Sequence, residues 1–484
     1  MLPIEGSMMS VIVMFVSLIL TILLIVKVKI NPVYAMLVGA IGAGIAFGIP
    51  LEPTPLVDAA GAPLMQYNAA GELVQRVQTG VLQVVINGFG TTIGNIGIVI
   101  LLGTTIGVIL EQTGGALVLA NTILKAVGRR NSSLAMALSG YLVSIPVFSD
   151  TAIVIMAPVA RTVSARSGKS QIACLGALNA GIMATHTIVP PTPGPLAAAG
   201  TLGVDLGFMI TVGLIVALAY TLLALLWVNS KICVGRFPEP SKVEGIEVIL
   251  DEKDFTIKSD KKLPNAPLTF ACLLVPILLI CFNSFGRLAM TDDNVLLPFM
   301  AFFGHPIMAL GIGVVMCFFL DMKFTSIKKI GEWFNKSIDV SAFIILATGT
   351  AGSYGFILRE SQVGEFMGNA IAETALPVVF IPFLVTMLLV LSNGSATVSL
   401  ITGSMIMYPL LPFLGLHPGI VALALTAGAS FAYHVNASHY WVVVRSANMT
   451  MREGFFNVTG GTAIGSVGAM IAVFVLSLFI GAPL

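Results

Sequence analysis

The sequence predicts an all-α polytopic membrane protein built from two inverted-topology repeats with re-entrant hairpins or broken helices. Of the 484 residues, 57% are hydrophobic and only 10% are charged, whereas a soluble domain carries roughly a quarter charged residues. The mean hydropathy is +0.98, and long apolar runs recur along the whole chain. Three stretches of the first half also reappear, in the same order, in the second half.

The apolar runs number about ten to twelve full spans, with additional hairpins or half-helices where glycine and proline interrupt them. The first run, residues 8–26, is followed by Lys27 and Lys29. A cleavable signal peptide carries its basic residues before the apolar region, so this run is expected to stay as a helix in the lipid bilayer.

Charged stretches divide the chain into three parts. Residues 1–228 form the first predicted repeat, 229–266 a lysine-rich cytoplasmic linker, and 267–484 the second repeat. The positive-inside rule places the start of the first repeat outside and the start of the second inside, so the two repeats have opposite orientations.

Internal similarity supports this division. The aligned pairs are Gln112 with Glu360, Ala152 with Ala396, Asn179 with Thr426 and, after one inserted residue, His186 with His434. Three nearly equal offsets in one order favour an inverted repeat, which is typical of transporters; chance pairing of apolar segments is the alternative.

Two polar interruptions are expected to form the centre of a binding site. The first is the run 144–151, in which Pro146 breaks a helix. Ser149, Asp150 or Thr151 can then cap the helix that begins after the break. The second contains the matching candidates Asn393, Gly394, Ser395 and Thr397. Two restarting helices would aim their positive ends at one anion, although ordinary kinks with satisfied hydroxyls would look the same.

Asp150 is the sharpest single candidate. A carboxylate within a span is costly and is usually functional, so we expect Asp150 to carry a proton. A structural cap, or a partner for a basic residue, is the alternative role.

A second pair of interruptions contributes further candidates. Four prolines fall within residues 190–195, beside His186 and Thr192, and cannot continue a regular helix. The matching run contains His434 and Asn436, while Asn179 and Thr426 precede the two interruptions. Each histidine can bind substrate, relay protons or satisfy a core carbonyl.

A third matched pair is Glu111–Gln112 with Arg359–Glu360, at the ends of apolar runs. Glu111 is a candidate for proton coupling. An interfacial pair with snorkelling side chains is the alternative.

The composition argues against several other classes. A net charge of +1 implies no nucleic-acid partner, and five scattered cysteines suggest no disulfide framework, metal site or cofactor. Paired intramembrane aspartates or an HExxH motif would favour an enzyme, and a ring of charges or a carbonyl filter motif would favour a channel; none of these patterns occurs.

The motifs together resemble the gluconate permease (GntP) family of proton symporters. The matching runs are GTTIGVILEQTGGA, FSDTAIVIMAP, NAGIMATHTIVPPTPGP, NGSATVSL and HVNASHYW, in family order. The resemblance implies an elevator-type transporter of the bacterial inner membrane, forming a homo-oligomer. The chain departs from the family pattern at Ser149–Thr151, Thr192 and Ala437, where the family often has acidic or imidazole groups.

The combined prediction is a proton-coupled symporter that imports a small sugar acid or hydroxy acid such as gluconate, with Asp150, His186, His434 and Glu111 as proton-coupling candidates. The alternative is a sodium-coupled symporter of a related small carboxylate, such as glycerate, D-serine or 3-hydroxybutyrate.

Overall fold

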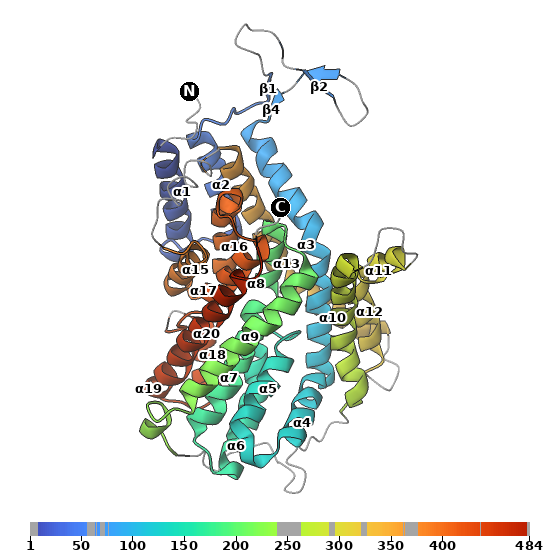
Figure 1. Ribbon diagram of the computed structural model, residues 1–484, viewed down its shortest axis with the longest axis vertical. Helices are drawn as coiled ribbons and strands as arrows, with labels where there is room; N and C mark the ends of the chain where they lie inside the picture. The colour runs from blue at the N-terminus through green and yellow to red at the C-terminus, as the bar shows by residue number, and fades with distance from the viewer. Residues whose placement is uncertain are drawn as a thin grey trace. The chain divides into compact units, whose positions relative to one another are not determined.

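The computed structural model describes residues 8–55, 63, 65–67, 73–75, 77–239, 263–289, 296–320, 327–361, 363, 376–435 and 437–481 (Figure 1). Regular structure in these ranges is helical apart from four short strands. Strand β1 (Thr54–Pro55) pairs antiparallel with β4 (Val77–Gln78), and β2 (Met65–Tyr67) pairs with β3 (Leu73–Gln75). The prediction of an all-α architecture is therefore confirmed in all but one loop.

The chain forms two compact units, each of which takes segments from both sequence halves. Unit 1 comprises Met1–Asn95, Ile345–Val378 and Met405–Gly415, and unit 2 the remainder. The units therefore do not coincide with the predicted repeats, whose boundaries at 228 and 267 stay a prediction. Most of the predicted linker, 240–262, lies outside the described residues.

Unit 1 contains α1 (Met8–Val26), α2 (Pro32–Ala46), η3 (Tyr408–Phe413) and parts of two long helices, α3 (Val81–Thr113) and α13 (Ile327–Glu360). The two long helices pack closely through glycine, since a Cβ on Gly88 would lie 2.7 Å from the Gly352 carbonyl oxygen. The Ser353 hydroxyl donates to the Val85 carbonyl, 2.8 Å away. Small residues and hydroxyls at such crossings are typical of membrane helices.

Unit 2 contains a hairpin, an interrupted helix pair and a closing helix twice, and one further helix precedes the first copy. The first series is α4 (Gly115–Val127), the hairpin α5 (Ser132–Val143) and α6 (Ser149–Ser167), the interrupted pair α7 (Gln171–Ile188) and α8 (Pro193–Leu202), and α9 (Leu206–Val228). The second is the hairpin α15 (Phe380–Asn393) and α16 (Ala396–Met407), the interrupted pair α17 (Pro418–Ala429) and α18 (Ser438–Ser446), then α19 (Met451–Gly454), η4 (Phe455–Thr459) and α20 (Gly460–Ser477). The two closing helices, α9 and α20, pack against each other (Figure 1).

The packing between hairpin and interrupted helix also repeats. A Cβ on Gly181 of α7 would collide with the Ala137 carbonyl of α5, and a Cβ on Gly428 of α17 would collide with the Phe383 carbonyl of α15. The two glycines lie 247 residues apart, as do the first residues of α6 and α16 and those of α7 and α17. One constant offset therefore relates the two hairpins and the helices behind them.

This offset corrects two pairings expected from the sequence. At the hairpin tips, Ser149 corresponds to Ala396 and Asp150 to Thr397, so the pairing of Ala152 with Ala396 was shifted by three residues. His186 corresponds to Tyr433 without any insertion, and not to His434. Both expected pairings join identical residue types, alanine with alanine and histidine with histidine, that do not lie at the constant offset.

Local sequence explains where the helices begin. Asp205 accepts a hydrogen bond from the Phe208 backbone N–H, 2.8 Å away, at the start of α9. Thr450 and Glu453 form a reciprocal capping box on α19. Proline stands in the first turn of α2, α8, α17 and α12 (Pro306–Phe318), where its missing N–H has no cost.

Among the described residues, eight helices are long and apolar enough to cross a membrane. A ninth span results if α11 (Leu297–Phe303) and α12, bent by 59°, count as one. The described residues thus contain fewer candidate spans than the ten to twelve expected for the chain. Several apolar runs form short helices such as α5, whose 12 residues extend only about 18 Å and cannot cross a hydrocarbon core of about 30 Å. The remaining long helix, α10 (Ala266–Ala289), packs against α9 and α12.

Candidate functional site

The first hairpin tip, residues 144–148, breaks the chain between α5 and α6. The Ser144 hydroxyl donates to the Val147 carbonyl at 3.0 Å, which closes the turn around Pro146. The N-cap of α6 is Phe148, and no side chain caps this helix. The predicted capping by Ser149, Asp150 or Thr151 is therefore wrong, because all three residues lie inside the first turn. Asp150 is consequently available for another partner.

The second tip is the turn between α15 and α16, and it has the predicted features. Gly394 adopts φ = 72°, a left-handed conformation that glycine reaches without strain. The Asn393 side-chain oxygen accepts from the Ser395 N–H at 2.7 Å, and the Ser395 hydroxyl accepts from the Val398 N–H at 3.4 Å. The backbone N–H of Ala396, at the start of α16, donates to the Tyr433 hydroxyl at 3.0 Å.

Both tips line one polar cavity in unit 2, with an empty volume of about 550 Å³. Its lining comes from the two tips, from the two helix interruptions and from the start of α18. The lining residues are Phe148, Ser149, Asp150, His186, Gly394, Ser395, Ala396, Thr397, Tyr433, Ser438 and His439. The prediction that 148–152 and 393–397 are interrupted and close together is therefore supported by the geometry of unit 2.

Three helices begin at this cavity: α6 at Ser149, α16 at Ala396 and α18 at Ser438. The unpaired N–H groups and the dipole at a helix N-terminus favour a negative charge. None of the described lining residues is a lysine or an arginine. The positive potential that the described lining offers an anion therefore comes from backbone amides at the helix starts.

A chain of hydrogen bonds extends from the cavity into the core. His439 Nδ1 lies 2.8 Å from Asp150 Oδ1, and His439 Nε2 lies 2.8 Å from Asn179 Oδ1. The Asp150 side chain is 47% exposed, whereas that of His439 is 5% exposed. Asp150 thus faces the cavity, His439 forms a largely buried part of its wall, and Asn179 lies behind His439 in the protein interior.

His186, in the last turn of α7, also lines the cavity. Its ring packs against Phe148 with centroids 6.2 Å apart, and its buried Nδ1 has no hydrogen-bond partner among the described residues. A buried ring nitrogen without a partner is costly, so the unsatisfied Nδ1 sets His186 apart from the other lining residues.

The predicted site residues separate into two groups. Those that line the cavity are Ser149, Asp150, His186, Gly394, Ser395 and Thr397. Asn179 reaches it through His439, and Asn393 shapes the second tip. Asn436 lies outside the described residues.

Five other predicted residues do not line this cavity, and four of them have partners elsewhere. The Thr426 and Thr192 hydroxyls donate to the Leu423 and Val189 carbonyls, and the His434 ring lies 3.3 Å from the Leu391 carbonyl. Glu111 forms an ion pair with Lys336 at 3.0 Å near the surface, which agrees with its alternative interfacial role. Thr151 lies in α6 beside Asp150.

The sequence prediction missed Phe148, Ala396, Tyr433, Ser438 and His439. Within the polar run 433–439 the sequence favours His434 over His439, because His434 matches His186 in residue type. The feature that distinguishes His439 is its position relative to the next helix. Because α18 begins at Ser438, His439 lies in the first turn of α18, just as Asp150 lies in the first turn of α6.

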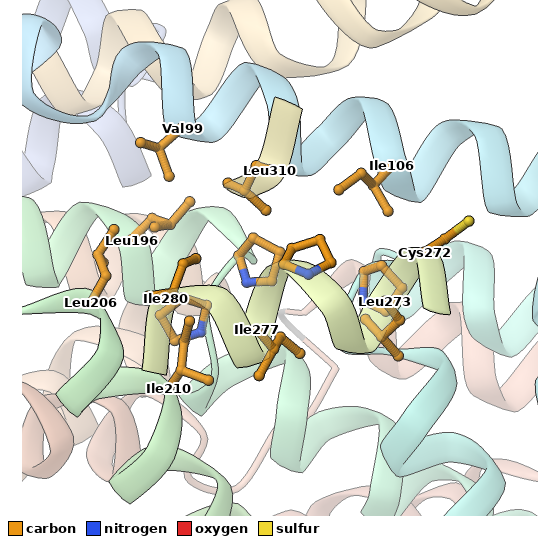
Figure 2. Close-up of a pocket in the computed structure, with 14 residues that line it drawn as sticks. Val99, Ile106, Leu196, Leu206, Ile210, Cys272, Leu273, Ile277, Ile280 and Leu310 are labelled. Atoms are coloured by element: carbon orange, nitrogen blue, oxygen red, sulfur yellow. The ribbon is translucent and has the colours of Figure 1, made fainter. Parts of the chain in front are cut away.

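A second cavity in unit 2 lies behind the first tip and has an empty volume of about 410 Å³ (Figure 2). Figure 2 shows aliphatic side chains from α3, α9 and α10 pointing into it, among them Ile106, Ile210 and Ile277. Pro146, Pro190 and Pro191 complete its wall. This apolar lining offers few partners for a hydrophilic acid, so the polar cavity is the candidate substrate site.

Comparison with known structures places the fold. The chain resembles the YdaH transporter of Alcanivorax borkumensis, which has an unusual topology, with a TM-score of 0.64 at 14% identity over 93% of this chain and 99% of that one. It also resembles MtrF of Neisseria gonorrhoeae, from a class of antimetabolite efflux pumps, with a TM-score of 0.66 at 13% identity over 95% and 98%. The predicted class, a helical membrane transporter of this repeat type, is confirmed.

Sequence comparison gives closer relatives. The chain is 30% identical to a gluconate permease of Pseudomonas aeruginosa over 96% of both chains. It is 27% identical to the D-serine transporter DsdX of Escherichia coli over 96% of this chain and 98% of that one. The profile of the GntP family permeases matches residues 72–479. The chain is therefore a multi-pass bacterial inner-membrane protein that belongs to the GntP permease family.

Proposed function

We propose that this permease is a proton-coupled symporter that imports a small sugar acid or hydroxy acid such as gluconate. The observation that carries the proposal is the polar cavity in which three helix N-termini face the Asp150–His439 pair. Relatives named as gluconate permeases and as a D-serine transporter support a small hydroxylated acid as the substrate.

The substrate carboxylate binds at the helix N-termini. Backbone N–H groups at the starts of α6, α16 and α18 supply hydrogen bonds without a fixed cation. At α16 the Tyr433 hydroxyl already accepts the Ala396 N–H and keeps its own proton to donate. A carboxylate beside Tyr433 would accept a hydrogen bond from its hydroxyl.

The substrate hydroxyls bind to the polar side chains around the carboxylate. Ser149, Ser395, Thr397 and Ser438 each present a hydroxyl that can both donate and accept. The His186 ring, which also lines the cavity, adds a further polar group to this wall. This lining suits a substrate with several hydroxyls better than an apolar acid.

The Asp150–His439 pair carries the proton. A carboxylate and an imidazole 2.8 Å apart share a proton readily, and the pair faces the same cavity as the substrate. With the proton bound, the pair is neutral overall, which lowers the cost of moving the occupied site through an apolar environment.

Both hairpin tips, the interrupted helices and the cavity belong to unit 2. Substrate and proton are therefore held by one compact unit, which is the arrangement that an elevator-type motion requires. A homo-oligomer, implied by the family resemblance, stays a prediction.

Uptake by purified protein in liposomes tests the proposal. Gluconate, glycerate, D-serine and 3-hydroxybutyrate are offered separately, with either a pH gradient or a sodium gradient as the only driving force. We expect the pH gradient, acidic outside, to concentrate gluconate inside the vesicles. Accumulation that requires sodium and ignores the pH gradient would establish the sodium-coupled alternative, and preferred export would contradict import.

A further inference from the structure

The His439 ring lies between two oxygen atoms. One is Oδ1 of the Asn179 amide and the other is Oδ1 of Asp150, each 2.8 Å from a ring nitrogen. An amide oxygen only accepts hydrogen bonds, so the nitrogen that faces it, Nε2, must carry a hydrogen. The second contact also needs a hydrogen, because a carboxylate oxygen and a bare ring nitrogen would repel each other.

These two contacts define how many protons the pair holds. If Nδ1 is also protonated, the ring is an imidazolium beside a carboxylate. If Nδ1 is bare, the carboxyl group of Asp150 must be protonated and donate to it. Both forms contain one proton more than a neutral ring beside a carboxylate, so the amide orientation with Oδ1 toward Nε2 corresponds to the proton-loaded pair.

When that proton is released, Asn179 must present a hydrogen-bond donor to His439 Nε2 in place of an acceptor. The neutral ring keeps its hydrogen bond to the Asp150 carboxylate only if its single hydrogen moves to Nδ1. Nε2 then becomes an acceptor and faces the Asn179 oxygen, which is also an acceptor. A half-turn of the amide replaces this oxygen with the side-chain NH₂ group and restores the contact.

The geometry points to Asn179 as the positioning residue that sets the proton load of the Asp150–His439 pair, its amide oxygen favouring the loaded form and its NH₂ group the empty form. This inference rests on the proposed proton coupling and assigns a role to a residue that does not line the cavity. Asn179 lies on α7 and is 1% exposed, so water does not compete with its amide for the hydrogen bond to the His439 ring.

The other ionisable groups around His439 come from neighbouring segments. Asp150 of α6 forms the direct contact, His186 of α7 lines the same cavity, and the Tyr433 ring stands edge-on to His439 with centroids 6.0 Å apart. Glu453 of α19, which packs against α18, binds the backbone and hydroxyl of Thr450 instead. The contact to Nε2 comes from the Asn179 amide, which does not ionise.

Two substitutions at this position should act in opposite directions. Asn179→Asp keeps an acceptor at Nε2 and adds negative charge, so the pair should hold its proton to higher pH. Asn179→Leu removes the acceptor and should release the proton at lower pH. We expect the external pH of half-maximal gluconate uptake to rise by about one unit in the first variant and to fall by about one unit in the second.

The measurement uses the full-length protein in liposomes, with labelled D-gluconate and a series of external pH values. Thr187→Val serves as the control, because Thr187 is a buried α7 residue whose hydroxyl bonds to the Met183 carbonyl of its own helix. Gluconate exchange at equal pH on both sides shows that each variant is folded and binds substrate.

Opposite shifts with an unchanged control support the inference. Shifts in the same direction, or unshifted profiles in variants that still exchange gluconate, overturn it. Variants that lose exchange altogether also count against it, since a residue that only sets the proton load should spare exchange. If uptake by the unmodified protein ignores the pH gradient, the proposed function fails and not merely the role of Asn179.

Discussion

At the scale of single residues, the site depends on one carboxylate placed in the first turn of a helix. Asp150 does not cap α6, because the chain enters the helix at Phe148. Its side chain instead contacts His439 and is half exposed to the polar cavity. A carboxylate that faces the cavity and can share a proton with a neighbouring imidazole suits the transfer of a proton from one side of a membrane to the other.

The substitution Asp150→Asn should abolish accumulation of gluconate driven by a pH gradient. Asparagine keeps the size of the side chain but cannot carry a proton, so a pH gradient of one unit would no longer support its roughly tenfold concentration ratio. Steady-state uptake in liposomes measures the ratio. Asp205→Asn is the matched control, because Asp205 only caps α9 and asparagine caps nearly as well. Undiminished accumulation in Asp150→Asn would exclude Asp150 as the carrier.

His186 should act on the substrate and not on the proton. Its ring lines the polar cavity, and its buried Nδ1 has no partner among the described residues. His186→Leu removes one hydrogen bond to substrate, so the KM for gluconate should rise about tenfold while the pH profile keeps its shape. Initial rates at several pH values measure both quantities. A displaced pH profile with an unchanged KM would instead place His186 in proton transfer.

At the scale of secondary-structure elements, the cavity exists because the chain is interrupted at the tips of two hairpins. Pro146 and Gly394 end the first arms, and the arms are held against α7 and α17 by close contacts at Gly181 and Gly428. The Thr386 hydroxyl adds a bond to the Leu425 carbonyl at 2.7 Å in the second hairpin, and the Thr185 hydroxyl a bond to the Tyr141 carbonyl at 2.9 Å in the first. These contacts fix where the helix N-termini point.

The substitution Gly181→Ala should destabilise the first hairpin. The added methyl group would collide with the Ala137 carbonyl, and such overpacking costs about 1–3 kcal/mol. We expect a lower melting temperature in detergent and slower gluconate uptake. Gly311→Ala in α12 is the control, because a Cβ there meets open space and should leave the melting temperature unchanged or raise it. Equal stability of both variants would show that the α5–α7 contact is not as tight as described.

At the scale of the whole molecule, the sequence predicted the interruptions better than their pairing. Proline and glycine act through local backbone geometry, so the breaks at Pro146, 190–195 and Gly394 were visible in the chain. Which side chains meet depends on the register between distant helices. His434 and His439 are equally polar and only five residues apart, and only the start of α18 at Ser438 turns His439 toward Asp150.

The division into units was likewise beyond the sequence. Inverted repeats follow chain order, whereas compact units follow packing, and α3 and α13 each contribute to both units. The described residues contain fewer candidate spans than the sequence predicts, for a related reason. Hydropathy reports that a helix is surrounded by apolar groups, but it does not distinguish lipid from the protein that encloses a hairpin arm.

The most direct test of the account is the proton flux that accompanies gluconate. Liposomes containing the protein and a pH-sensitive dye are clamped at zero membrane potential, and gluconate is added outside without any pre-formed pH gradient. The account predicts that gluconate entry acidifies the lumen, and that Asp150→Asn abolishes this acidification while gluconate exchange continues. Gluconate entry without acidification, or the same acidification in Asp150→Asn, would contradict it.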